Sequence, residues 1–136
     1  MDTNVVSELR KGVRCHPGVA AWFEQVSPEE VFFSVLTVGE IRQGVEKLRR
    51  RDTVAAEVLE TWLTELVAIH GDRILSIDQS VAEQWGRFNV PDRKAVIDCL
   101  LAATAKVHDL TLVTRNLKDV ERTGVRCIDP FGSRPA

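Results

Sequence analysis

Acidic and amide side chains stand where the predicted strands and helices of this chain meet. Asp2 begins an amphipathic run, Glu40 lies one turn into the run after VFFSVLT, and Asp98 lies within the apolar AVIDCLLAATA. The stretch TRNLKD adds Asn116 and Asp119 after the apolar LTLV. Grouped carboxylates repel one another unless a cation lies between them, and carboxylate oxygens suit Mg²⁺ or Mn²⁺. Because such an ion activates water and orients phosphate, the residues indicate a metal-dependent hydrolytic site.

Each of these residues also has a structural interpretation. Asp2 is a good N-cap for the first predicted helix. Thr37 and Glu40 have the spacing of a capping box, and Asn116 suits a turn or a helix cap. Asp98 differs from the others, because apolar neighbours on both sides would bury it in part. A buried carboxylate is costly unless it is paired or bound to a metal, so the functional interpretation is strongest there.

The elements that position these residues alternate along the chain. Apolar residues at helical spacing predict helices over residues 5–9, 18–26, 37–50, 52–71, 79–88 and 95–109. Short apolar runs rich in β-branched residues predict strands over residues 31–37, 73–78, 110–115 and 125–129. This alternation is typical of an α/β domain with a largely parallel sheet, in which sites form at the carboxyl ends of strands.

Composition excludes several classes of protein. The chain has 136 residues, the size of one domain, and a net charge of −2, so no overall positive field favours nucleic acid. No apolar run approaches the roughly 20 residues that cross a bilayer, and no secretory signal is recognisable. A glycine-rich phosphate loop is absent from the sequence. The three cysteines form no C-x-x-C pair, so we expect free thiols and a cytoplasmic protein.

Four stretches resemble, in order, the PIN-domain ribonucleases of the VapC toxin family. They are MDTNVVSEL, SVLTVGEIRQGVEKL, VIDCLLAATAKVHDLTLVTRNLKD and TGVRCIDP. D-T-N alone is a weak signal, but together with T-x-x-E-I, I-D-x-x-x-A-A-T-A and T-R-N-x-x-D it is specific. The resemblance implies a single PIN domain over residues 1–136. Its α/β fold would have a central, mostly parallel sheet flanked by helices on both faces.

The resemblance also implies an activity and the residues that carry it. The protein would be the toxin of a type II toxin–antitoxin pair, an RNA endonuclease that requires Mg²⁺ or Mn²⁺. Carried over by position, the catalytic residues are Asp2, Glu40, Asp98 and Asn116, with the metal held chiefly by Asp2 and Asp98. Four further positions complete the site: Asn4, Thr114 and Arg115 toward the substrate, and Asp119 as an accessory acid.

The partners implied are a cognate VapB-like antitoxin that inhibits the enzyme and the RNA substrate. Operator DNA would be bound only through the antitoxin, the protein would form a homodimer or a hetero-oligomer, and no membrane would take part. An antitoxin helix would dock on the apolar helix surfaces between Pro17 and Gly71. The basic run KLRRRD at residues 47–52 either contacts RNA phosphates or is a solvated helix end.

Two departures from the family pattern favour an alternative function. Many PIN domains have Asp at the position of Asn116, and most have a short apolar strand before D-T-N, where only Met1 precedes Asp2 here. We therefore expect a sheet that lacks a strand at its centre and an Asp2 that is poorly anchored. The alternative is a catalytically weakened PIN-domain subunit that acts in an antitoxin–operator DNA complex.

Overall fold

The computed structural model describes residues 1–93 and 95–132, apart from the side chain of Asp119. Its α-helices are α1 (Thr3–Leu9), α2 (Pro17–Gln25), α3 (Val35–Arg49), α4 (Thr53–His70), α5 (Gln79–Phe88), α6 (Val96–Val107) and α7 (Leu117–Val120). Its strands are β1 (Phe33–Ser34), β2 (Ile74–Leu75), β3 (Leu112–Val113) and β4 (Cys127–Ile128). None of the described helices is both long and apolar enough to span a bilayer.

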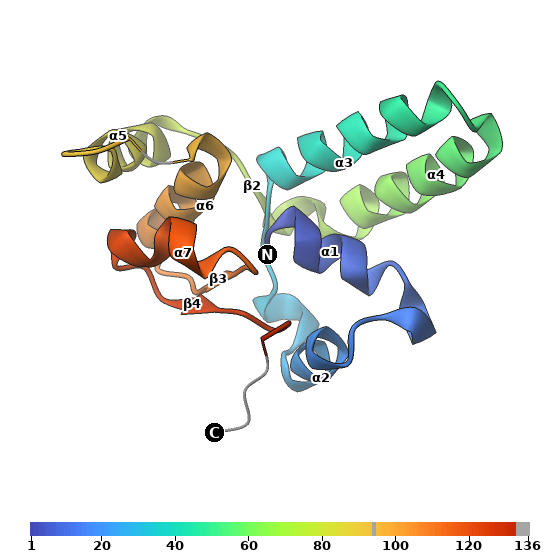
Figure 1. The fold of residues 1–136 in the computed structure, drawn as a ribbon, viewed down its shortest axis with the longest axis horizontal. Helices are drawn as coiled ribbons and strands as arrows, with labels where there is room; N and C mark the ends of the chain where they lie inside the picture. The colour runs from blue at the N-terminus through green and yellow to red at the C-terminus, as the bar shows by residue number, and fades with distance from the viewer. Residues whose placement is uncertain (94, 133–136) are drawn as a thin grey trace.

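The strands form two parallel ribbons with the N-terminus between them (Figure 1). β1 pairs with β2, and β3 pairs with β4. The α-amino group of Met1 donates to the carbonyl of Phe32 at 3.1 Å, next to β1, and the backbone N–H of Asp2 donates to the carbonyl of Val113 at 3.0 Å. Met1 and Asp2 thus connect the two ribbons by hydrogen bonds. The described residues supply no strand between the ribbons, as the sequence led us to expect.

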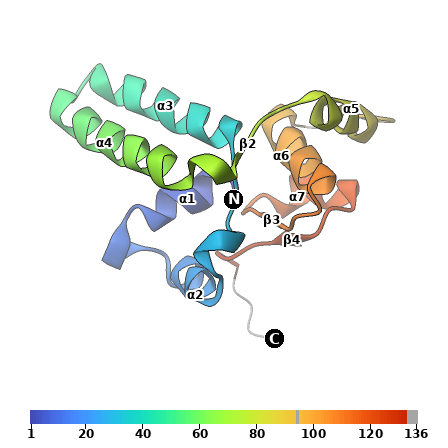
Figure 2. The same cartoon turned by 180° about the vertical axis from the view of Figure 1, so that it is seen from behind.

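The helices gather on either side of this bridge. Figures 1 and 2 show α3 and α4 as an antiparallel pair on one side, and α5, α6 and α7 with β3 and β4 on the other. Helix α1 connects separate parts of the core, because Val6 packs with Phe33, Ile41 and Leu63, whereas Val5 packs in a second cluster with Val19 and Val113. A third cluster joins α6, β3 and α7. The first helix therefore holds the two halves of the molecule together.

The strand predicted over residues 31–37 is wrong at its carboxyl end. The ladder covers only Phe33 and Ser34, and α3 begins at Val35 because the Ser34 hydroxyl oxygen accepts the N–H of Leu36 at 3.0 Å. The predicted capping box at Thr37 is wrong for the same reason. Thr37 lies inside α3, fully buried, and its hydroxyl donates to the Met1 carbonyl at 3.4 Å.

The other predicted strands are also shorter than expected. Each is reduced to a two-residue ladder, at Ile74–Leu75, Leu112–Val113 and Cys127–Ile128. A strand needs a hydrogen-bonding neighbour along its whole length. Between β1 and β3, the described residues supply only Met1 and Asp2 as backbone hydrogen-bond partners. The predicted helices all occur, with shifts of a few residues at their ends.

Candidate active site

Asp2 is the first residue of the site, and it is firmly anchored, so the expectation of poor anchoring is wrong. Its carboxylate Oδ1 accepts the N–H of Val5 at 3.1 Å, which makes Asp2 the N-cap of α1. Its Oδ2 accepts a hydrogen bond from the hydroxyl of Thr114. Asp2 is only 3% exposed. The same carboxylate therefore begins α1 and ties it to the segment that follows β3.

Glu40 lies beside the D-T-N stretch rather than at a helix cap. It projects from the second turn of α3, is half-buried, and accepts a hydrogen bond at Oε1 from the hydroxyl of Thr3. Thr3 directly follows Asp2 in the chain, so the residue that bonds the Glu40 carboxylate is next to the residue that carries the other carboxylate. Sequence reasoning assigned no role to Thr3, and its place in D-T-N was the only signal of one.

Thr114 and Asn116 complete the group of bonded residues. Thr114 is 1% exposed, and its hydroxyl oxygen accepts the backbone N–H of Asn116 at 3.0 Å while donating to Asp2. Asn116 occupies the N-cap position of α7, yet its side chain makes no capping hydrogen bond within the described residues. Its amide therefore does not serve the structural role that the sequence also allowed.

The structure also places the remaining predicted residues. Asn4 is exposed on the first turn of α1, Arg115 is exposed after β3, and Asp98 is half-buried in the first turn of α6. Among the described residues no three acidic, histidine or cysteine side chains gather closely enough to hold a metal. The side chain of Asp119 lies outside the described residues. A direct role for Asp98 and for Asp119 in the site stays a prediction.

The charge of Asp2 has little local compensation. In the described part of the chain, neither Asp2 nor Glu40 forms an ion pair with a lysine, arginine or histidine. Burial lowers the pKa of the Met1 α-amino group from 8.0 to about 6, although the charge of Asp2 opposes this shift. The amino group is therefore less able to offset the charge of Asp2 near pH 7 than an ordinary α-amino group would be. A buried carboxylate that only hydrogen-bond donors satisfy attracts a cation, and its hard oxygens fit Mg²⁺ or Mn²⁺, which bind through one or two carboxylates and several waters.

The basic run at residues 47–52 contributes to packing. Arg49 pairs with Glu46 at 3.4 Å, with Glu57 at 3.3 Å, and with Glu60. The contacts with Glu57 and Glu60 link α3 to α4, and the pKa of Arg49 is raised, chiefly through the hydrogen bond to Glu60. Arg50 and Arg51 are exposed at the end of α3. For Arg49 these contacts therefore favour a role in packing α3 against α4 over contact with RNA phosphates.

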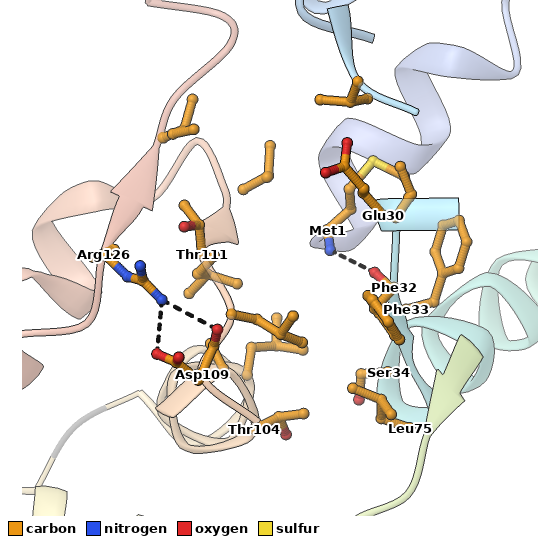
Figure 3. Close-up of a pocket in the computed structure, with 18 of the residues that line it drawn as sticks. Met1, Glu30, Phe32, Phe33, Ser34, Leu75, Thr104, Asp109, Thr111 and Arg126 are labelled. Carbon is orange, nitrogen blue, oxygen red and sulfur yellow. Dashed lines mark hydrogen bonds and ion pairs between the residues drawn. The ribbon is translucent and has the colours of Figure 1, made fainter. Parts of the chain in front are cut away.

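A cavity of about 520 Å³ opens next to Met1 (Figure 3). Phe33 and Ser34 line one side of it, and Thr104 and Thr111 line the other. None of the described site residues lines this cavity. Because it separates β1 from β3, it is a gap in the sheet. The candidate site instead lies where β1 and β3 end, as expected for a parallel sheet.

The sequence model of the PIN domain matches residues 1–124. The chain belongs to the PIN-domain family. It is 34% identical over 140 residues to the toxin FitB of Neisseria gonorrhoeae, with 96% of each chain covered. It is 29% identical over 138 residues to the VapC ribonuclease Y4jK of Sinorhizobium fredii, again with 96% of each covered. A structure of FitAB bound to an IR36 DNA fragment matches with a TM-score of 0.85 and 28% identity, over 98% of this chain and 96% of that one.

These similarities confirm the expected PIN-domain α/β fold and the resemblance to VapC-type toxins. The family match ends at residue 124, and β4 follows it at Cys127–Ile128, paired with β3. A single PIN domain over all 136 residues stays a prediction. Within this PIN domain, the residues joined by hydrogen bonds come from the D-T-N, T-x-x-E-I and T-R-N stretches.

Proposed function

We propose that this PIN-domain protein is the toxin of a type II toxin–antitoxin pair and cleaves RNA with the help of Mg²⁺ or Mn²⁺. The observation that carries the proposal is the pair of side-chain contacts Thr114–Asp2 and Thr3–Glu40. They join three distant stretches of the chain at the carboxyl ends of β1 and β3. The relatives named as a toxin and as a VapC ribonuclease support the same activity.

Each residue has a distinct role in the proposed reaction. Asp2 and Asp98 would hold the metal, which when bound makes water more acidic and offsets charge on the phosphate. Thr114 orients the Asp2 carboxylate, and the side chain of Asn116 helps to hold the attacking water. Glu40 is oriented through Oε1 by Thr3, so its Oε2 accepts the proton of that water as general base.

The substrate-facing residues lie at the outer edge of the site. Arg115 is exposed next to Thr114, and Asn4 is exposed two residues after Asp2, so both are accessible to a long RNA strand. An arginine binds phosphate through paired N–H donors. Arg115 therefore contacts the scissile or a neighbouring phosphate, and Asn4 contacts the adjacent nucleotide.

The proposed antitoxin binds close to Glu40. A groove of about 470 Å³ between α3 and α4 is lined by Val35, Val38, Gly39, Arg42, Leu63, Thr64 and Val67. Gly39 precedes Glu40 in the chain. An amphipathic antitoxin helix seated in this groove would block access to Glu40, which explains inhibition. Operator DNA would be bound only through that antitoxin, with the toxin present as a homodimer or in a hetero-oligomer.

A cleavage assay on total cellular RNA tests the proposal. The parent should cleave in Mg²⁺ and stop in excess EDTA, and Glu40→Gln should be inactive in both. Glu65→Gln is the matched control, because Glu65 is exposed on α4 and forms no ion pair among the described residues. Cleavage that persists in EDTA or in Glu40→Gln would contradict the proposal.

A weakened subunit in an antitoxin–DNA complex is the second candidate. Asn116 stands where many PIN domains have Asp, and the described residues contain no three-carboxylate cluster. FitAB, a structural relative, is bound to DNA. Calorimetry with Mn²⁺ separates the two functions, because a weakened subunit should show no binding heat. For a metal-binding toxin, Mn²⁺ at 100 times its Kd should instead raise the free energy of unfolding by about 2.7 kcal/mol.

A further inference from the structure

Three side chains from distant segments, Arg115, Phe131 and His16, form a cluster that includes the residue directly after Thr114. The ring of Phe131, in the segment after β4, lies 4.2 Å from the guanidinium carbon of Arg115. The imidazole of His16, which caps α2, packs against the same ring with a centroid distance of 5.1 Å and an angle of 59°. Phe131 thus contacts both the cation that follows Thr114 in the chain and the residue that caps α2, far from it in sequence.

This cluster is linked to Asp2 through two routes. On one side Arg115 directly follows Thr114, whose hydroxyl donates to Asp2. On the other side the carboxylate of Glu8, near the end of α1, accepts the backbone N–H of His16 at 2.7 Å, and Asp2 caps the other end of α1. The contacts form a closed ring, so the position of Phe131 is determined relative to Asp2.

The backbone around Phe131 is held equally firmly. The carboxylate of Asp129 accepts the N–H groups of Phe131 at 2.9 Å and Gly132 at 3.2 Å. The carbonyl of Pro130 lies against Gly18 so closely that a Cβ on Gly18 would be 2.1 Å from it. Glycine at residue 18 therefore allows the segment after β4 to rest on α2 and to present Phe131.

We infer that Phe131 is a positioning residue that holds the Arg115 guanidinium beside the Asp2–Thr114 pair to bind a phosphate of single-stranded RNA. The inference rests on the proposed function and deepens it. Arg115 forms no ion pair in the described part of the chain, so its charge is available to a ligand. A ring face orients the guanidinium plane while its N–H donors at the rim remain able to bind phosphate.

The test measures RNA binding without cleavage, by fluorescence anisotropy of a labelled mixed-sequence oligoribonucleotide in EDTA. Arg115→Gln should weaken binding about tenfold, because it removes a charge-assisted hydrogen bond. It should also reduce the slope of log Kd against log salt by about 0.7, the value of one phosphate contact on a single strand. Arg122→Gln is the matched control, since Arg122 is exposed beyond α7, and it should leave binding unchanged.

The variants of Phe131 distinguish positioning from general packing. Phe131→Leu should weaken binding about threefold, in line with loss of one cation–π contact. Phe131→Trp should restore it, because a ring face is present again. In the Arg115→Gln background Phe131→Leu should have no further effect. Additive losses in the double variant, or parent-like binding by Phe131→Leu, would overturn the inference.

Gly18→Ala perturbs the same cluster without changing a ring or a charge. It should displace the segment carrying Phe131 and weaken binding about threefold, like loss of the cation–π contact, but only when Arg115 is present. Gly44→Ala on α3, where a Cβ meets nothing within 4 Å, is its control. If Phe131→Leu melts too low to assay, Gly18→Ala decides in its place.

The outcomes for binding and for cleavage separate this inference from the proposed function. If RNA binding depends on Arg115 and Phe131 but the parent protein does not cleave RNA in Mg²⁺, the proposed nuclease activity alone is refuted. If the parent protein cleaves RNA but substitution of Arg115 and of Phe131 leaves RNA binding unchanged, this inference alone is refuted.

Discussion

The hydroxyl of Thr114 donates a hydrogen bond to the carboxylate of Asp2, although 112 positions separate the two residues in the chain. Both side chains are buried, and the Asp2 backbone N–H also pairs with Val113, which precedes Thr114. The contact fastens α1 to the end of β3, whose ladder with β4 is only two residues long. It thus serves both the fold and the candidate site.

Thr114→Val should lower both stability and activity. The change removes the donor to Asp2 in a buried setting and the acceptor for the Asn116 N–H in a partly buried one. Leaving buried polar groups without partners costs about 1–3 kcal/mol each, which urea unfolding would measure. Thr114→Ser retains the hydroxyl and should remain close to the parent in activity. A Thr114→Val protein with parental stability would show that the Asp2 carboxylate finds another donor.

Asp2→Ser and Asp2→Ala separate the two roles of Asp2. Serine is a good N-cap, whereas alanine loses about 1 kcal/mol at such a position, so the Ser variant should melt higher than the Ala variant. Both should fail to cleave RNA and to bind Mn²⁺, because a neutral hydroxyl replaces a carboxylate poorly on a hard cation. Cleavage by Asp2→Ser at the parental rate would mean that Asp2 is only a cap.

Asp98→Asn should abolish RNA cleavage and leave the fold intact. Asp98 is half-buried in the first turn of α6, among residues that pack in the core. An amide of the same shape is easier to bury than a charged carboxylate, so circular dichroism and the melting temperature should show a folded protein. Unchanged cleavage with a melting temperature several degrees lower would instead make Asp98 a structural residue.

The buried α-amino group of Met1 should make stability depend on pH. Its pKa is about 6 when folded, against 8.0 as its ordinary value, so between these values the unfolded chain binds the extra proton. Protonation therefore favours unfolding, and stability falls as the pH drops from 8 to 6. The two-unit difference corresponds to about 3 kcal/mol at most. Urea unfolding at several pH values would measure this dependence.

Two derivatives serve as controls for the Met1 prediction. Acetylation of Met1 removes the titrating group and should abolish this part of the pH dependence. Three apolar residues placed ahead of Met1 should do the same, and should also raise the melting temperature by filling the cavity of about 520 Å³ between β1 and β3. An extended chain no more stable than the acetylated one would show that the cavity does not accept a strand.

Local pattern was sufficient for most of the architecture. Periodicity located the helices, and β-branched runs located the strands to within a few residues, because burial of an apolar face dictates both patterns. The order of D-T-N, T-x-x-E-I and T-R-N along the chain is by itself enough to indicate the PIN-domain family. Strand length was not predictable in this way, because a ladder depends on its neighbour, and here the central neighbour consists of Met1 and Asp2.

The sequence by itself determined which residue types are available for chemistry and on which elements they stand. Only the tertiary structure decided which of them meet. Whether Glu40 belongs to a capping box depended on where α3 begins, and Ser34 excluded that role by capping the helix three residues before Thr37. The contacts of Asp2 with Thr114 and of Phe131 with Arg115 and His16 join segments that no local pattern relates. Such pairs form only when the whole chain buries its core, because packing brings distant residues within hydrogen-bonding distance.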